Sequence, residues 1–183
     1  MQSVRRRRTI VATLVTAAAG ALFAVAQPAS AVILSRTATR NTSAPTGTNA
    51  NSGWQWQGHW GGGFVGTPIA PQYFITAEHI DGAKGQAIYW NGKNYTTTAQ
   101  YDDPLTDLRI FKISGTFSSY APIYTGSSET GKRAMVFGRG TTRSSEVKKG
   151  TTLKGCKWGA LDKVKSWGEN NVAGTLSGGA GLG

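Results

Sequence analysis

From Trp54 onward the sequence is a series of short β-branched and aromatic runs, interrupted every few positions by glycine, asparagine or proline. The clearest unit is Asn91-Gly92, which separates the runs at residues 86–90 and 93–100, and Asn-Gly in that position is typical of a tight β-hairpin. Further runs of this kind lie at residues 64–67, 69–76, 107–113, 134–137, 144–148, 153–158 and 164–167. No helical periodicity of convincing length follows the first 31 residues. We therefore expect an all-β barrel or sandwich.

The N-terminus has the composition of an export signal. Four consecutive arginines, Arg5–Arg8, precede an uncharged, alanine-rich run at residues 10–26, and small residues surround Ala31. This order is typical of a cleaved secretory signal, so we expect a signal peptide over residues 1–31 and a secreted or extracytoplasmic protein without a membrane association after cleavage. An uncleaved anchor is the alternative. Residues 32–53 are rich in Thr, Asn, Ser and Gly, which predicts a flexible or disordered tail.

The charge is unevenly distributed. The formal net charge is +11, and four of the cations lie in the expected signal. Residues 32–130 hold six cations and six anions, whereas residues 131–183 hold ten cations and three anions. No nucleic-acid-binding motif organises these cations, so we expect no nucleic-acid partner.

The composition also limits the other classes of partner. With 39% hydrophobic residues the chain is not a disordered polymer, and the single cysteine, Cys156, has no intrachain disulfide partner. Two histidines and one cysteine do not form a recognisable zinc set, and Gly61-Gly62-Gly63 lacks the lysine and helix of a phosphate loop. We expect neither a metal nor a cofactor.

Two residues at the ends of apolar strands carry the chemistry. His79 ends the apolar segment at residues 69–79, and Asp107 opens the apolar strand at residues 107–113. An imidazole paired with a carboxylate is the arrangement that activates a nucleophilic hydroxyl, because the carboxylate fixes the tautomer of the ring and stabilises the imidazolium. His79 and Asp107 are therefore our candidate catalytic residues.

The strings around these residues resemble trypsin-like serine proteases of the bacterial secreted type. Phe74-Ile75-Thr76-Ala77-Glu78-His79 is similar to the family's histidine segment, and Asp107-Leu108-Arg109-Ile110-Phe111-Lys112-Ile113 is similar to its aspartate segment, in the same order. Met135-Val136-Phe137-Gly138-Arg139-Gly140 is similar to a strand of the second barrel. The resemblance implies a hydrolase with a double β-barrel over residues 54–183, in which the first barrel is present and the second is partial. It implies a protein or peptide substrate.

Three positions depart from the family pattern. Glu78 stands where the family has a small residue and adds a charge beside His79, and Ile80 stands where many members have a cysteine. The family's serine motif is absent. Thr175-Leu176-Ser177-Gly178-Gly179-Ala180 keeps only its Ser-Gly-Gly core, and we interpret Ser177 as an ordinary loop serine. The resemblance therefore implies a chain truncated before the catalytic serine, which would be inactive as given.

Three functions follow from these patterns. The first is a serine endopeptidase whose nucleophile lies beyond Gly183, with His79 as base and Asp107 as its partner. The second is a catalytically dead protease-like binding domain. The third is a secreted β module that binds a glycan or an anionic surface through lysines and a platform of tryptophans, namely Trp54, Trp56, Trp60 and Trp90. For these four rings we favour the filling and the rim of a barrel over a platform.

Overall fold

The computed structural model describes residues 39–174, in which ten strands make up most of the regular structure. The strands are β1 (Gly58–Trp60), β2 (Phe64–Ala70), β3 (Tyr73–Ala77), β4 (Ala87–Trp90), β5 (Lys93–Asp102), β6 (Leu108–Ile113), β7 (Arg133–Gly138), β8 (Thr141–Lys149), β9 (Thr152–Leu161) and β10 (Ser166–Asn171). Two short 3-10 helices, η1 (Gly47–Asn49) and η2 (Trp54–Trp56), precede them. The predicted all-β class is confirmed. The expected signal peptide and Ser177 lie outside the described residues.

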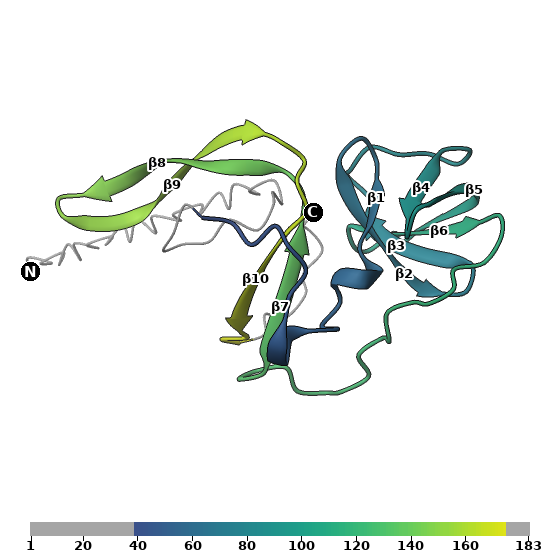
Figure 1. Ribbon diagram of the computed structural model, residues 1–183, viewed down its shortest axis with the longest axis horizontal. Helices are drawn as coiled ribbons and strands as arrows, with labels where there is room; N and C mark the ends of the chain where they lie inside the picture. The colour runs from purple at the N-terminus through teal and green to yellow at the C-terminus, as the bar shows by residue number, and fades with distance from the viewer. Residues whose placement is uncertain (1–38, 175–183) are drawn as a thin grey trace, which may run out of the picture.

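The first six strands close into a barrel in the order β1-β2-β3-β6-β5-β4 (Figure 1). Each neighbouring pair is antiparallel, and closure leaves no open edge in this sheet. Asn91 and Gly92 form the β4–β5 hairpin, where both residues have positive φ angles of 47° and 79°. This is the conformation that an Asn-Gly type I′ turn requires, as the sequence predicted.

Aromatic rings fill the barrel. Phe74 and Phe111 are fully buried and stack with ring centroids 5.3 Å apart, and the ring of Trp60 lies 4.6 Å from that of Phe111. The remaining core side chains are Ile80, Ile88, Trp90, Ile113 and Phe117. Ile88, Trp90 and Ile113 lie at alternate strand positions, as the two-residue period of a strand with one buried face requires, whereas Ile80 and Phe117 enter the core from the loops that follow β3 and β6. Burial of each large apolar side chain stabilises the fold by roughly 1.5–3 kcal/mol.

The largest difference from the predicted strands of the barrel is a break at Pro71. We expected a single strand at residues 69–76, but β2 ends at Ala70, and Pro71 and Gln72 form the turn into β3. Pro71 has no N–H to donate to a sheet ladder, and it carries the chain into a reversal instead. The expectation of a continuous strand was wrong. The short strand β1 was also not predicted, because three residues give too little periodicity.

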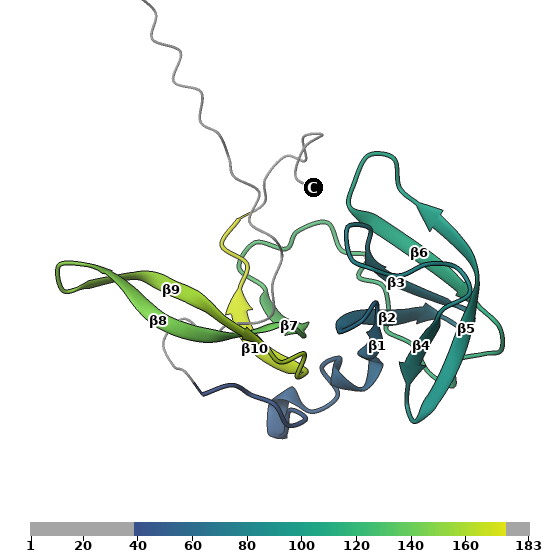
Figure 2. The ribbon, with the colours of Figure 1, turned by 90° about the horizontal axis from the view of Figure 1, so that it is seen from above.

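The remaining strands form two antiparallel ribbons beside the barrel. β7 pairs with β10 over six residues, and β8 pairs with β9 in a long hairpin with three irregularities. Figures 1 and 2 both show the β8–β9 hairpin extending away from the barrel. Its strands are mostly exposed, and its exposed apolar side chains are Val147, Leu153, Trp158 and Leu161.

The described part of the expected tail contacts the β7–β10 ribbon. Asn41 forms a β-bridge with Trp167, and the Trp167 Nε1–H donates to the carbonyl of Ser43 at 2.9 Å. Asn49 bonds to the side chains of Arg133 and Glu169. Residues 39–53 therefore lie against strands far away in the sequence, through polar contacts that composition alone does not reveal. Over residues 39–174, no helix is long and apolar enough to cross a membrane.

Candidate active site

Antiparallel pairing of β3 with β6 brings His79 and Asp107 together. The register places Ala77, the last residue of β3, opposite Leu108, the first residue of β6. The chain that leaves β3 therefore emerges beside the chain that enters β6. His79 lies two residues beyond the end of one strand and Asp107 one residue before the start of the other.

Three hydrogen bonds join Asp107 to His79 and to its neighbour Glu78. The Nδ1 of His79 lies 2.5 Å from the Oδ2 of Asp107, and the main-chain N–H of His79 donates to the Oδ1 of Asp107 at 2.9 Å. The main-chain N–H of Glu78 donates to the carbonyl oxygen of Asp107 at 3.1 Å. The carboxylate thus engages both the ring and the backbone of one histidine, which leaves the imidazole little rotational freedom.

The electrostatics favour an ionised Asp107. Partial burial acts to raise the pKa of its carboxyl, but the hydrogen bonds from the backbone and ring of His79 outweigh burial and place that pKa below its ordinary value of 3.8. At neutral pH the carboxylate can only accept hydrogen bonds, so the Nδ1 of His79 is the donor. The Nε2 of the same ring is then free to accept a proton. The His79 side chain is 46% exposed, so its ring can be reached from outside the protein.

The carboxylate of Glu78 pairs with Arg109 and not with the ring of His79. Arg109 lies 3.7 Å from the Glu78 carboxylate, donates to the Glu78 carbonyl oxygen at 3.1 Å, and bonds to Asp102 at 2.5 Å. Asp102 and Arg109 are partners in the β5–β6 register. A guanidinium thus balances the extra charge of Glu78 and ties the histidine segment to the barrel. The alternation of Arg109 with apolar residues on β6 was visible in the sequence, but its two acidic partners were not.

The side chain of Ile80 packs in the barrel core and so holds the segment that carries His79. That side chain is 8% exposed and belongs to the barrel core, one residue after His79. Apolar burial thus anchors the chain at the position where many trypsin-like proteases have a cysteine. Cys156, half-buried on β9 and opposite Glu146, takes no part in this region.

Within the described part of the chain, the side-chain and main-chain N–H hydrogen bonds of His79 both run to Asp107. Within residues 39–174 no serine or threonine hydroxyl is hydrogen-bonded to His79. Ser177 lies outside the described residues. The described site therefore contains an imidazole and the carboxylate that fixes its orientation, with no hydroxyl bonded to the ring within residues 39–174.

The tryptophans do not form a shared platform. Trp60 and Trp90 are core residues with 2% and 3% of their surface exposed. The Nζ of Lys165 lies 4.0 Å above the ring centroid of Trp54, and Phe137 packs against the same ring edge-on. Trp60 and Trp90 thus fill the barrel, as we favoured. The ring of Trp54 has one face covered by the ammonium group of Lys165.

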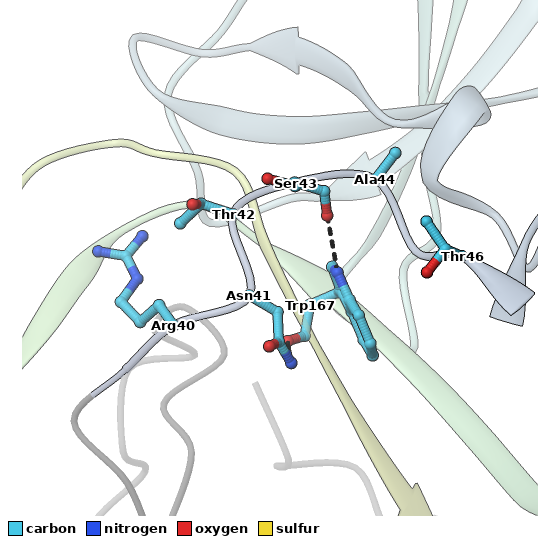
Figure 3. Close-up of a pocket in the computed structure, with 7 residues that line it drawn as sticks. All are labelled: Arg40, Asn41, Thr42, Ser43, Ala44, Thr46 and Trp167. Carbon is cyan, nitrogen blue, oxygen red and sulfur yellow. Dashed lines mark hydrogen bonds between the residues drawn. The ribbon is translucent and has the colours of Figure 1, made fainter.

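A separate shallow cavity of about 250 Å³ lies between the N-terminal segment and Trp167 (Figure 3). It is lined by Arg40, Asn41, Thr42, Ser43, Ala44, Thr46 and Trp167. The Nη1 of Arg40 bonds to Asp162 at 2.5 Å and its Nη2 to the carbonyl of Val164, so both terminal nitrogens of this guanidinium are already engaged. The lining has no carboxylate, imidazole or thiol to act as an acid or base. Over residues 39–174, no three His, Cys, Asp or Glu side chains cluster as a metal site would require.

Comparison with protein-family models, with curated proteins and with solved structures finds no match to this chain.

Proposed function

We propose that His79 and Asp107 are the general base and its orienting carboxylate in a secreted, trypsin-like serine endopeptidase. The observation that carries the proposal is the pair itself: a carboxylate with a lowered pKa, 2.5 Å from the Nδ1 of a histidine whose ring is exposed. The pair lies where two neighbouring strands of a closed six-stranded barrel meet. In this interpretation the β7–β10 and β8–β9 ribbons belong to a partial second barrel.

The chemistry follows from the positions of the protons. The Nε2 of His79 takes the proton of a serine hydroxyl as the oxygen attacks the peptide carbonyl carbon, and Asp107 stabilises the imidazolium that forms. The same Nε2–H then protonates the departing amine as the C–N bond breaks, which leaves an acyl-enzyme. Water repeats the cycle, with its proton passing to His79 and then to the released serine oxygen.

The serine in this scheme comes from outside residues 39–174. Donors for the oxyanion would come with it, since backbone N–H groups near the nucleophile usually supply them. A catalytically dead, protease-like binding domain is the second candidate, and it is favoured by the lack of a hydroxyl bonded to His79 within the described residues.

Hydrolysis by the natural gene product separates the two candidates. We would isolate the product from its own cells with an antibody against residues 141–161 and measure cleavage of a quenched-fluorescence peptide library. The endopeptidase proposal predicts cleavage that falls by about 10³-fold in His79→Ala, because general-base catalysis contributes 10²–10⁴-fold. Asp81→Asn, an exposed carboxylate two residues from His79, is the matched control and should retain activity. No cleavage by the natural product, or equal cleavage by His79→Ala, would refute the endopeptidase.

A further inference from the structure

Three basic residues gather where the two ribbons approach the barrel. Arg139 follows β7, and Lys163 and Lys165 lie between β9 and β10. The N–H groups of Asp162 and Lys163 both donate to the carbonyl of Gly140 at 3.1 Å, and the Arg139 Nη1–H donates to the carbonyl of Lys163 at 2.9 Å. We call Arg139, Lys163 and Lys165 the cation cluster.

The cluster is partly desolvated. Arg139 and Lys165 are half-buried, and the Nε of Arg139 is buried without a hydrogen-bond partner in the described structure. Burial, and then the charge of Arg139, lower the pKa of Lys165 to about 8. Burial, and then the charges of Arg139 and Lys163, also lower the pKa of the nearby His59. The positive charge of Arg139 therefore disfavours the protonated forms of both Lys165 and His59.

The described residues do not supply a compensating anion. Asp162, the acid next to Lys163 in sequence, bonds to Arg40 instead. The Nζ of Lys165 contacts only main-chain carbonyls, those of Trp54 at 3.2 Å and Gln57 at 3.5 Å, and the ring of Trp54. None of the three cations forms an ion pair with a carboxylate of residues 39–174. Neighbouring cations without a carboxylate partner, two of them half-buried and one exposed, favour an external anion.

The cluster lies across a glycine turn from the histidine segment. A Cβ at Gly61 would be 1.9 Å from the carbonyl oxygen of Asp81, two residues after His79, and a Cβ at Gly63 would be 2.4 Å from the Cδ of Lys163. The turn formed by Gly61–Gly63 therefore packs against the His79 segment on one side and Lys163 on the other. Figure 2 shows the short strand β1, which leads into this turn, on the side of the barrel nearest the ribbons.

We propose that the cation cluster is a subsite for a carboxylate of the peptide that binds at His79 and Asp107. The proposal rests on the proposed endopeptidase function and gives it a substrate class, namely acidic peptides. A carboxylate is the anion that a peptide carries, either on Asp or Glu side chains or at its C-terminus. The fork of the Arg139 guanidinium suits such a group, and Lys163 and Lys165 add charge beside it.

Calorimetric titration of the full chain with three uncleaved model peptides tests the subsite. The first is an acetylated, amidated alanine pentapeptide with a central glutamate, and the second has glutamine in its place. The third is the glutamine peptide with a free C-terminal carboxylate. We expect the glutamate peptide to bind about tenfold more tightly than the amidated glutamine peptide, as one charge-assisted contact supplies. A preference for the third peptide instead assigns the subsite to a C-terminal carboxylate.

Matched variants separate the subsite from general electrostatic attraction. Arg139→Gln should remove the preference for the carboxylate, and so should Lys163→Gln, whose side chain is exposed and whose replacement leaves the core intact. Lys157→Gln on β9 removes the same charge from the hairpin and should keep the preference. Equal affinity for all three peptides, no binding of any of them, or an equal loss in Lys157→Gln would overturn the proposal.

The outcome is separable from that of the proposed function, because peptide binding needs no nucleophile. His79→Ala should retain the preference for a carboxylate while it loses hydrolysis. A carboxylate preference in a protein without hydrolytic activity would support the subsite and refute the endopeptidase. Hydrolysis without any preference for a carboxylate would support the endopeptidase and refute the subsite.

Discussion

Replacement of Asp107 by asparagine perturbs the site with the least change in shape. The carboxamide oxygen can still accept the main-chain N–H of His79, which Oδ1 accepts at 2.9 Å in the native protein. The amide nitrogen, however, is a donor and would face Nδ1 of the ring, which lies 2.5 Å from Oδ2. Two donors cannot share one hydrogen bond, so the ring must place its proton on Nε2. We therefore expect Asp107→Asn to exchange the tautomer of His79 and remove its capacity to act as a base.

The expected loss of stability follows from the two hydrogen bonds between His79 and the Asp107 carboxylate, which both lose a charged acceptor. Hydrogen bonds to charged groups stabilise by about 1.5–3 kcal/mol and neutral ones by about 1 kcal/mol, so loss of the charge weakens each bond by roughly 0.5–2 kcal/mol. The side chains are 46% and 27% exposed, and solvent screening reduces the sum to about 1 kcal/mol. At a urea slope of about 2 kcal/mol/M, the unfolding midpoint should fall by about 0.5 M at neutral pH.

The pH dependence has a defined sign. The carboxyl of Asp107 has a lower pKa in the folded protein than its ordinary value of 3.8, so its contribution is present above 3.8 and is lost as the pH falls through the lowered value. The difference in stability between the native chain and Asp107→Asn should therefore close under strongly acidic conditions.

Two measurements check this reasoning. The ¹⁵N shifts of the His79 ring identify the protonated nitrogen in each protein, and urea titrations give the midpoints. Asp81→Asn is the control, since this exposed side chain forms no hydrogen bond or ion pair within residues 39–174. An unchanged tautomer in Asp107→Asn, or a midpoint shift no larger than that of Asp81→Asn, would refute the account of the pair.

Three further predictions concern the barrel and its junction with the ribbons. Phe111→Ala should lower the free energy of unfolding by about 3–5 kcal/mol in a denaturant titration, because it empties a fully buried site between two aromatic rings; a loss under about 1 kcal/mol would contradict this core. Gly61→Ala should lower the melting temperature more than Gly92→Ala, since both have positive φ but only Gly61 would clash with a carbonyl, and equal losses would argue against that packing. The free energy of unfolding should rise between about pH 8 and 10.5, because the half-buried ammonium of Lys165 loses its proton, and with it the cost of burying a charge, at a lower pH in the folded than in the unfolded chain. Lys165→Met should flatten this rise, and a variant with the same pH profile as the native chain would exclude the effect.

The strand pattern was largely predictable because it is local. Asn91-Gly92 specifies its own turn, and the alternation on β6 places Phe111 and Ile113 inward. Prediction failed where local signals conflicted: the apolar run at residues 69–76 looks continuous, but Pro71 interrupts it. Closure of the barrel depends on pairings between distant strands, such as β1 with β4, which no local pattern specifies.

The candidate pair could be named from the sequence, but its surroundings could not. His79 and Asp107 were proposed from the strings around them, and the β3–β6 register brings them together. The link between Arg109 and the two acids Glu78 and Asp102 depends on how three segments meet in space. The cation cluster likewise forms only when the segments after β7 and β9 come together, and the sequence showed no more than a basic C-terminal part.

Labelling of the natural gene product with a fluorophosphonate probe tests the central claim most directly. A serine activated by His79 and Asp107 should form a covalent adduct, which mass spectrometry assigns to one residue, and the adduct should be lost in His79→Ala and retained in Asp81→Asn. Such a result would identify the missing nucleophile of the site. A product that takes up no label, or one that His79→Ala labels as fast as the native chain does, would contradict a general-base role for this pair.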